Sequence, residues 1–357
     1  MIILKKSSKK RENISIDLMN SNEIDDLMTS GFFQGKPIKG RLEETNISWV
    51  ILSEEFVFKI KKPVKLNFLD YSTLELRKLN CEKELELNQR FSPIYLSVLP
   101  IIKSQNQWMI GETKGEIVDY AVCMLKLESD RRMDLLLEQN KVSGEQVVKL
   151  AGQVAEFHLG AKVLQKEIPI NYFFEIFNDL KSVTEIAGQY LGLEYVSKIA
   201  SLLIWSDDFI KEHFQRLQDR MNIGFFRDVH GDLHSRNIFI YDDPIIFDCI
   251  EFEESFRQID VLYEVAFICM DLESFGRNDF PDRFLKTYLE AYDCMPSIED
   301  KKIFQYYKCL RANIRAKVFL LDAGSEPDSN KRTGKLESGK AYLDLAVSYM
   351  DSMKLDF

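Results

Sequence analysis

Two short polar segments in the second half of the chain carry the residue types that phosphoryl transfer requires. Asp232 and Asn237 are five positions apart in the run HGDLHSRN, and Asp248 follows after a short apolar segment. A carboxylate can orient an acceptor hydroxyl and take its proton, while Mg²⁺ neutralises the phosphates. Mg²⁺ prefers oxygen ligands and keeps several waters, so one carboxamide and one carboxylate are sufficient protein ligands. The spacing therefore indicates Asp232 as the base, with Asn237 and Asp248 as metal ligands.

The same segment permits two other interpretations. His230, Asp232 and His234 alternate, so an extended strand would put all three side chains on one face, as in a metal centre for hydrolysis. His158 and His213 lie inside helical patterns and add no further ligand pair, and a metal triad leaves the asparagine unexplained. Asx residues also form polar turns without a catalytic role. We interpret His230 as a residue that braces the loop by hydrogen bonding.

The elements that would position these residues change character along the chain. Residues 17–30 have a helical pattern, and the β-rich runs 47–52 and 56–60 flank a polar turn that is typical of a hairpin. Residues 72–91 carry apolar side chains at helical spacing, with Ser72 as the predicted N-cap. Further strands are predicted at 95–102, 107–111 and 117–125. The pattern indicates a small α+β lobe over residues 1–125, in which the basic, polar stretch 1–16 is loosely ordered.

The chain from 126 to 357 is predicted to be a large, mostly helical lobe. A short hairpin interrupts it, formed by the apolar runs 237–241 and 245–247, and this hairpin carries Asp248. A polar loop at 324–334 separates the last two helices. Helical periodicity occurs at 144–161, 171–185, 189–202, 205–221, 257–273, 280–293, 299–323 and 335–353.

At these motifs the sequence resembles a known family. HGDLHSRNIFI and IFDCIEF are similar to the catalytic and metal-binding motifs of the aminoglycoside phosphotransferases and choline kinases, relatives of the protein kinases. Upstream, TNISWVIL, FVFKIKKPVKLNFLDYSTLELRK and CEKELELN resemble the nucleotide lobe of an uncharacterised bacterial branch of this group. The resemblance runs from about residue 40 to about residue 320. It implies a bilobal protein-kinase-like fold, with a nucleotide-binding lobe at 1–125 and a catalytic and substrate lobe at 126–357.

The family also implies roles for a lysine and a glutamate. Lys59 in the run FVFKIK matches the strand lysine that binds ATP phosphates. Strand alternation puts Lys59 and Lys61 on one face, so Lys61 is the competing choice. Glu84 matches the helix glutamate that pairs with this lysine, and Glu82 is a weaker alternative.

Two further contacts with the nucleotide follow from the resemblance. Thr45 and Ser48 fall where the phosphate-covering loop of the family lies, although this sequence has no Gly-x-Gly-x-x-Gly there. Val122, Cys123 and Met124 fall at the lobe connection, where backbone groups would meet adenine; we name Cys123 and Met124 as nucleotide contacts. The expected cofactors are ATP and Mg.

The remaining charged residues near the motifs leave alternatives open. Asp248-Cys249-Ile250-Glu251 stands in place of Asp-Phe-Gly, which argues against an activation switch of the protein-kinase type. Glu251, Glu253 and Glu254 could form an acidic rim for a cationic acceptor, or an ordinary exposed loop. Arg311 and Arg315 share a helical face, where they could bind an anionic substrate group, although ion pairs with carboxylates are favoured. Arg257 and Asp260 are expected to brace the catalytic loop from the following helix.

Composition restricts the class of protein. The chain has 357 residues, 45% of them hydrophobic, and a net charge of -10, which disfavours nucleic-acid binding. Its six cysteines form no CxxC pair, and we expect reduced thiols in a cytoplasmic protein. No apolar run suits a signal peptide or a membrane span.

The sequence therefore predicts a kinase that moves the γ-phosphoryl group of ATP to a hydroxyl of a small molecule. The alternative is a nucleotide-binding regulatory or scaffold protein with little turnover. The sequence leaves open which compound is the acceptor and whether the acceptor is a protein. It also leaves open whether ATP or GTP is preferred and what the oligomeric state is.

Overall fold

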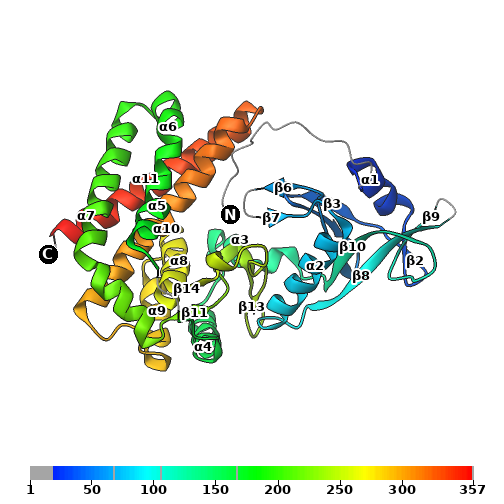
Figure 1. The fold of residues 1–357 in the computed structure, drawn as a ribbon, viewed down its shortest axis with the longest axis horizontal. Coiled ribbons are helices and arrows are strands. Elements are labelled where there is room, and N and C mark those ends of the chain that lie inside the picture. Colours follow the sequence, from blue (N-terminus) through cyan, green and yellow to red (C-terminus); the bar gives the residue numbers. More distant parts are fainter. Residues whose placement is uncertain (1–18, 67–68, 105–106, 166–167, 356–357) are drawn as a thin grey trace. The chain divides into compact units, whose positions relative to one another are not determined.

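The computed structural model describes residues 19–66, 69–104, 107–165 and 168–355, which fall into two compact units (Figure 1). The sheet unit contains the described residues up to Arg132 together with Ile245–Phe256. The helical unit contains Met133–Pro244 and the described residues from Arg257 onward. The stretch 1–16, predicted to be loosely ordered, lies outside the described residues. The short segment Ile245–Phe256 thus packs with elements that are distant in the sequence.

A mainly antiparallel sheet forms the centre of the sheet unit. In the described residues its order is β2-β1-β9-β8-β10-β5-β4-β3, and only β1 and β9 pair in parallel. The strands are β1 (Phe32–Phe33), β2 (Lys36–Pro37), β3 (Arg41–Glu44), β4 (Ser48–Leu52), β5 (Phe56–Lys61), β8 (Tyr95–Ser104), β9 (Gln107–Ile110) and β10 (Glu116–Leu125). A separate antiparallel ladder joins β6 (Lys65–Leu66) and β7 (Leu69–Asp70). The predicted hairpin β4–β5 and the three later strands are confirmed.

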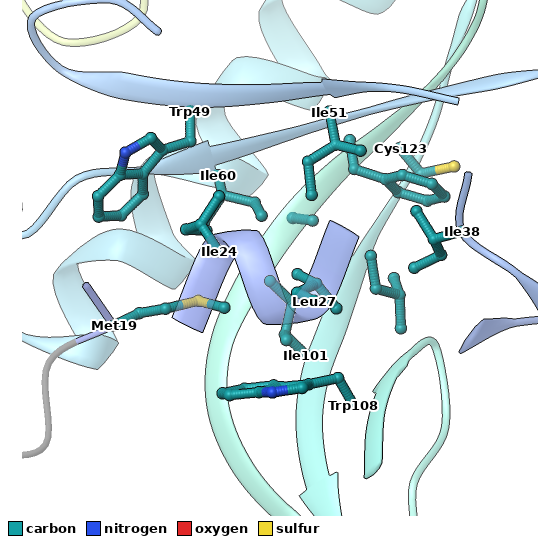
Figure 2. Close-up of a cluster of buried hydrophobic side chains, with 13 residues drawn as sticks. Met19, Ile24, Leu27, Ile38, Trp49, Ile51, Ile60, Ile101, Trp108 and Cys123 are labelled. Atoms are coloured by element: carbon teal, nitrogen blue, oxygen red, sulfur yellow. The ribbon is translucent and has the colours of Figure 1, made fainter. Parts of the chain in front are cut away.

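Helix α1 (Ser21–Ser30) covers one face of this sheet. It begins later than the predicted residue 17, because Asn20 has an extended backbone and its side chain accepts the N–H groups of residues 22 and 23. Ile24 and Leu27 are fully buried and pack against the sheet residues Ile51, Ile60, Ile101 and Trp108 (Figure 2). Each such aliphatic side chain contributes about 1.5–3 kcal/mol by leaving water.

Helix α2 (Leu74–Gln89) lies on the opposite face, against β8 and β10 (Figure 1). Ser72 is not its N-cap, because Asp70 accepts both the backbone N–H and the hydroxyl of Ser72. Thr73 caps the helix instead, by accepting the N–H of Leu76. The apolar cluster beneath α2 consists of Val57, Cys81, Ile94, Tyr95, Val122 and Met124, with Ile245 and Phe247 packed against it. This packing attaches the segment that carries Asp248 to the sheet unit.

The helical unit is built from long helices with short connections. Its helices are α3 (Met133–Glu138), α4 (Gly144–Gly160), α5 (Ile170–Asn178), α6 (Thr184–Tyr190), α7 (Leu193–Ile223), α8 (Val261–Ser274), α9 (Asp279–Ala291), α10 (Ile298–Ser325) and α11 (Ser329–Leu355). Most residues of the helices predicted at 189–202 and 205–221 form one continuous helix, α7, because no glycine or proline occurs between Leu193 and Ile223. The start at 189 was wrong: residues 189–190 end α6, and Gly192 precedes α7. The predicted loop at 324–334 shrinks to three residues between α10 and α11.

Short strands and a buried arginine frame the predicted catalytic segment. Strand β11 (Phe226–Asp228) pairs antiparallel with β14 (Gln258–Asp260), which leads directly into α8. Arg220 on α7 is fully buried and contacts Asp260 at 2.6 and 2.8 Å and Asp300 at 2.6 Å. Arg220 therefore ties α7 to the start of α8 and to α10.

The helical unit also contains the short strand β12 (Ile238–Phe239), whereas β13 (Ile245–Ile246) belongs to the sheet unit. All six cysteines are buried and take part in no disulfide. Within the described ranges, no helix combines the length and apolarity needed to cross a membrane. The chain is an α+β protein with an antiparallel-rich sheet and a large helical part, as predicted.

Candidate active site

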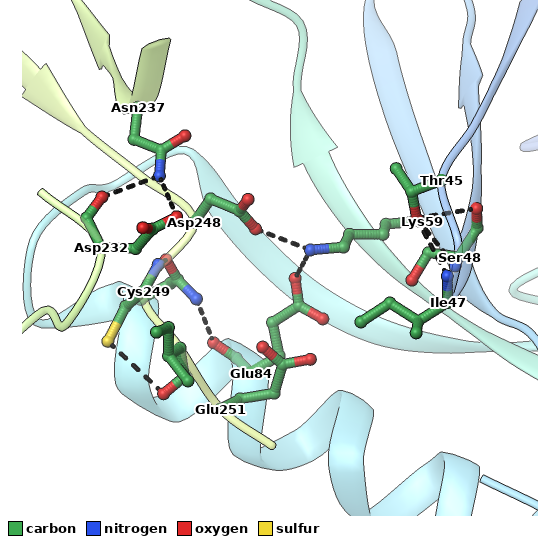
Figure 3. Close-up of polar contacts among 12 residues, drawn as sticks. Thr45, Ile47, Ser48, Lys59, Glu84, Asp232, Asn237, Asp248, Cys249 and Glu251 are labelled. Carbon is green, nitrogen blue, oxygen red and sulfur yellow. Dashed lines mark hydrogen bonds and ion pairs between the residues drawn. The ribbon is translucent and has the colours of Figure 1, made fainter. Parts of the chain in front are cut away.

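A lysine and two carboxylates form the centre of the candidate site in the sheet unit. The Nζ atom of Lys59 on β5 lies 2.6 Å from Oε1 of Glu84 on α2 and 2.7 Å from Oδ1 of Asp248 (Figure 3). Glu84 is fully buried, whereas the Asp248 side chain is 45% exposed. Burial by itself lowers the pKa of Lys59, but the charges of Asp248 and Glu84 raise that pKa well above its usual value. The ammonium group is therefore held in its charged form beside an accessible carboxylate.

Lys61 has a different environment, although it shares a strand face with Lys59. Its side chain is fully buried, its Nζ atom lies 2.7 Å from Oε2 of Glu84, and it also forms an ion pair with Glu251. The hydroxyl of Tyr71 donates a hydrogen bond to Glu251 at 3.0 Å. Lys59 retains 15% exposure of its side chain and Lys61 has none. Of the two lysines, Lys59 is thus the one that a ligand can reach.

The backbone around Asp248 is held by neighbouring elements of the sheet unit. Asp248 has a φ of +63°, a left-handed conformation that Asp tolerates better than most residues. Its N–H donates to the hydroxyl of Tyr95 at 3.1 Å. The N–H of Cys249 donates to Oδ1 of Asn88 on α2 at 2.8 Å. Strained backbone of this kind persists only where its surroundings hold it, and it concentrates at functional sites.

The three glutamates after Asp248 do not form an acidic rim. Glu251 is only 3% exposed and is paired with Lys61, so it is neither a rim residue nor part of an exposed loop. Glu253 accepts hydrogen bonds from the backbone and the hydroxyl of Ser255. Glu254 lies 3.4 Å from Lys83. The cationic-acceptor interpretation loses its main residue, because the charge of Glu251 is neutralised inside the protein.

Thr45 and Ser48 close the turn between β3 and β4. Oγ1 of Thr45 accepts the N–H of Ser48 at 2.9 Å, and the N–H of Thr45 donates to the carbonyl of Ser48 at 2.9 Å (Figure 3). Ser48 pairs with Lys61 in the sheet register, and its buried hydroxyl has no hydrogen-bond partner among the described residues. The turn is ordered by its own residues, without a glycine-rich sequence.

Cys123 and Met124 are adjacent on β10 and therefore face opposite sides of the sheet. Met124 belongs to the cluster under α2, together with Val122, which pairs with Lys59 in the sheet register. Cys123 belongs to the cluster under α1. A contact between Cys123 and a nucleotide on the Lys59 face would have to use its backbone, as the sequence analysis assumed.

In the helical unit, Asp232 and Asn237 are connected by hydrogen bonds. Nδ2 of Asn237 donates to the backbone carbonyl of Asp232 at 3.0 Å and approaches its Oδ2 at 3.4 Å (Figure 3). Nε2 of His234 lies 3.4 Å from Oδ2 of Asp232. His234 also caps the single 3₁₀ turn Ser235–Asn237 by accepting the N–H of Arg236. The Asp232 side chain is 18% exposed. This loop orients a carboxylate that solvent can still reach.

Two carboxylates on α8 hold the backbone of this loop. Glu264 accepts the N–H groups of His230, at 3.0 Å, and of Gly231. Two turns further along the helix, Asp271 accepts the N–H of Ser235 at 2.8 Å. Neither residue was predicted from the sequence, although two acidic residues seven positions apart in the mostly apolar run 261–272 were a visible signal.

The residues expected to brace the loop act elsewhere. Asp260 binds Arg220 and caps α8 by accepting the N–H of Leu262 at 2.9 Å. Arg257 forms an ion pair with Asp228, and its carbonyl accepts the N–H of Val229 at 2.8 Å. Arg257 thus supports the strand that enters the loop, while the loop itself rests on α8.

The metal-hydrolase interpretation finds no support in this arrangement. Nδ1 of the buried His230 lies 3.3 Å from the N–H of Asp232, which donates to it. His158 is enclosed by Glu264 at 3.0 Å and Tyr288 at 2.7 Å. In the part of the chain that the structure describes, no three His, Cys, Asp or Glu side chains form a metal-binding group.

The two predicted magnesium ligands are chemically suitable. Only Oδ1 of Asp248 is engaged by Lys59, and its second oxygen has no hydrogen-bond partner among the residues described. Asn237 uses its Nδ2 group to contact Asp232, which leaves its Oδ1 atom without a partner in the same set of residues. Both groups offer a hard oxygen donor, the type that Mg²⁺ prefers.

Comparisons with known proteins agree with the motifs. Residues 128–301 match the family model of the phosphotransferase enzyme family. An uncharacterised protein of Mycobacterium tuberculosis is 28% identical over 287 residues, which cover 78% of this chain and 54% of that protein. The chain therefore spans about half the length of the relatives it matches.

Two solved structures align with most of the chain. A protein of Ralstonia eutropha, provisionally assigned as an aminoglycoside phosphotransferase, has a TM-score of 0.51 at 10% identity, over 93% of this chain and 98% of that one. A choline/ethanolamine kinase family protein of Mesorhizobium loti has a TM-score of 0.49 at 11% identity, over 92% and 98% of the two chains. The family match confirms the predicted resemblance, and the likeness to the Ralstonia protein confirms the predicted fold.

Proposed function

We propose that this chain, whose residues 128–301 match the model of the phosphotransferase enzyme family, is an ATP-dependent kinase acting on a hydroxyl group of a small molecule. The observation that carries the proposal is the contact of Lys59 with both Glu84, at 2.6 Å, and Asp248, at 2.7 Å. Lys59 and Glu84 were assigned as a pair from the resemblance to the nucleotide lobe, and Asp248 from a separate motif that lies 189 positions after Lys59. Their contact supports the interpretation of each motif.

In this proposal Lys59 binds the phosphates of ATP, and Glu84 fixes its position. Glu84 is suited to this role because its pKa is lowered to about 2: burial raises it, but the charges of Lys59 and Lys61 outweigh that effect. Because Glu84 stays ionised, it keeps Lys59 charged and holds its ammonium group in one orientation. Thr45 and Ser48 would contribute phosphate contacts from the β3–β4 turn, and Cys123 and Met124 would contact adenine.

Asp232 is proposed as the base that orients the acceptor hydroxyl and takes its proton. A candidate base must lie within hydrogen-bonding reach of its substrate, and its carboxylate must be held in place. Asn237 and His234 contact its Oδ2 atom, and Glu264 anchors the preceding residue, Gly231. These contacts support a fixed orientation for the carboxylate.

Asn237 and Asp248 would hold Mg²⁺, which supplies charge neutralisation of the phosphates when it is bound. Each residue has an oxygen atom without a hydrogen-bond partner among the described residues. The asparagine is attached to Asp232 through its amide nitrogen, so the proposed base and the proposed ligand are linked within one loop.

The test is a screen of hydroxyl-bearing metabolites for ATP-dependent phosphorylation, read by mass spectrometry. Asp232→Ala is expected to reduce turnover by about 100-fold or more, the usual contribution of general-base catalysis. Asp248→Asn is expected to raise the magnesium concentration needed for half-maximal turnover. The matched control is Asp243→Asn, because that side chain is 80% exposed and near in sequence.

Three results would contradict the proposal. Undiminished turnover in Asp232→Ala would remove the proposed base. The same magnesium requirement in Asp248→Asn and Asp243→Asn would remove the proposed ligand. Nucleotide binding without phosphorylation of any acceptor would favour a regulatory protein.

A further inference from the structure

Two buried arginines on α10 lie in the helical unit, next to the loop that carries Asp232. Arg311 and Arg315 are 6% and 7% exposed and share a helix face, since they are four residues apart. The sequence favoured ion pairs with carboxylates for both. Among the described residues, neither guanidinium has a carboxylate oxygen within 4.0 Å. The predicted ion pairs are therefore absent from this part of the structure.

The other buried arginines of the protein show how unusual this is. Arg220 contacts two carboxylates, and Arg77 contacts Asp119 at 2.9 Å. A buried charge without a counter-ion is costly, and proteins normally pair it or hydrogen-bond it. Arg311 follows this rule, because it donates hydrogen bonds to the carbonyls of Tyr263 and Gly231. Arg315 has no hydrogen-bond partner for its buried Nε among the described residues, so its charge requires an explanation in terms of what the side chain binds.

Aromatic rings, rather than carboxylates, surround the arginine pair. The guanidinium carbon of Arg311 lies 3.7 Å from the centre of the Tyr263 ring and 4.5 Å from that of Phe267. That of Arg315 lies 5.0 Å from the Phe319 ring. Rings stabilise the flat faces of a guanidinium and leave the N–H groups at its edge available. Nε of Arg315 is buried and has no hydrogen-bond partner among the described residues.

The pair adjoins the proposed base. Nη2 of Arg311 donates to the carbonyl of Gly231, the residue before Asp232, at 3.2 Å. Arg315 is among the charges that act on the Asp232 carboxylate. The other carboxylate that it influences is Asp322, whose pKa is raised by burial despite the opposing charges of Lys335 and Arg315. Asp322, too, has no oxygen within ion-pair distance of Arg315 among the described residues.

We propose that Arg311 and Arg315 bind an anionic group of the phosphoryl acceptor, so that the acceptor is a small hydroxyl compound bearing a carboxylate or a phosphate. The inference rests on the proposed function, because it places this group beside the proposed base. A guanidinium edge matches both anions with two parallel N–H···O hydrogen bonds. A cationic acceptor would be repelled by the same pair.

The first test measures anion binding without requiring turnover. The Nε–H resonance of Arg315 is followed by NMR in the full chain while acetate, inorganic phosphate or ethanolamine is added, with and without Mg²⁺ and a non-hydrolysable ATP analogue. Acetate or phosphate is expected to shift the resonance, and ethanolamine is not. In Arg315→Gln the anion affinity, measured by calorimetry, is expected to fall about 10- to 100-fold, the usual range for loss of a charge-assisted hydrogen bond.

Matched variants separate recognition from general effects of charge. Arg315→Lys keeps the charge and is expected to retain part of the anion affinity. It cannot form the two parallel N–H···O hydrogen bonds that a guanidinium makes with a carboxylate or a phosphate. Arg283→Gln removes the same charge from an exposed position of the helical unit and is expected to change nothing. Equal anion affinity in Arg315→Gln and in the unmodified protein would overturn the inference, as would a resonance that no anion shifts. The same loss of affinity in Arg315→Gln and Arg283→Gln would mean an adventitious ion only and would also overturn it.

The second test compares acceptors that differ only in charge. A hydroxy acid is compared with its amide, a sugar phosphate with the free sugar, and both with an amino alcohol. The hydroxy acid and the sugar phosphate together show whether the acceptor carries a carboxylate or a phosphate. Arg315→Gln is expected to raise KM for the anionic member of a pair and to leave KM for the neutral member unchanged.

The two proposals fail in different ways. Phosphorylation of only neutral or cationic acceptors would overturn the anionic acceptor class and leave the kinase assignment intact. If no acceptor of either class is phosphorylated, the proposed function fails, and the titration alone decides whether the arginine pair is an anion site.

Discussion

Replacing Lys61 by methionine tests whether Lys61 serves mainly the stability of the fold, while Lys59 serves mainly nucleotide binding. Lys61 is fully buried between Glu84 and Glu251. In Lys61→Met, Glu84 retains Lys59 at 2.6 Å, but Glu251, which is 3% exposed, retains the Tyr71 hydroxyl in place of a cation. Removing one partner of a buried ion pair costs about 3–5 kcal/mol. We expect the free energy of unfolding to fall by that amount.

The comparison variant is Lys59→Met. It leaves Glu84 paired with Lys61, and it leaves Asp248, which is 45% exposed, in contact with water. The expected loss of stability is about 1–2 kcal/mol, because no deeply buried charge is left unpaired. Nucleotide affinity should show the opposite order, with the larger loss in Lys59→Met. One lysine would then serve mainly stability and the other mainly binding.

Urea unfolding followed by tryptophan fluorescence measures the stability. Trp49 and Trp108 lie in the sheet unit and Trp205 on α7, so a Trp205→Phe background restricts the signal to the sheet unit. Adding Glu251→Gln to Lys61→Met should restore at least about 2 kcal/mol, because it removes the unpaired charge. Equal losses in Lys61→Met and Lys59→Met, or no recovery in the double variant, would refute the reasoning.

Two other predictions concern charge and stability. Because the pKa of Glu84 is depressed from 4.5 to about 2, its stabilising contribution is complete above about pH 4.5 and is lost as the pH falls towards 2. Urea unfolding of Glu84→Gln should therefore show a weaker pH dependence in this window, and an unchanged slope would contradict the assignment. Arg220→Gln should lower the free energy of unfolding by about 3–5 kcal/mol, since Arg220 bridges two carboxylates, whereas Arg315→Gln should leave stability unchanged or raise it. Thermal unfolding of both variants checks this, and equal destabilisation would mean that Arg315 has a structural partner.

The sequence predicted the fold where local signals were strong. Two β-rich runs on either side of a polar turn predicted the β4–β5 hairpin, and strand alternation predicted that Lys59 and Lys61 share a face, as the register of β5 with β10 confirms. The positions of helix ends were less accurate. Ser72 and Thr73 are both good capping residues, and only the contact between Asp70 and Ser72 determines that Thr73 caps α2.

The candidate site was predictable in its residue types but not in its supports. Motif resemblance identified Lys59, Glu84 and Asp248, which do meet. Their roles, and those of Asp232 and Asn237, stay predictions. Whether the acidic residues after Asp248 are buried or exposed depends on long-range packing, which no local sequence pattern encodes. Glu251 looked like a surface charge because its partner, Lys61, is 190 residues away in the sequence.

The contact between Lys59 and Asp248 gives the proposed enzyme a reason to take up metal and nucleotide as one unit. Each residue is the counter-ion of the other, at 2.7 Å. If Asp248 held the metal, as proposed, it would no longer neutralise Lys59, and if Lys59 held the nucleotide phosphates, it would no longer neutralise Asp248. With both ligands bound, Asp248 would be paired with the metal and Lys59 with the phosphates. The two affinities should therefore reinforce one another, by the same factor in both directions, as reciprocity between coupled sites demands.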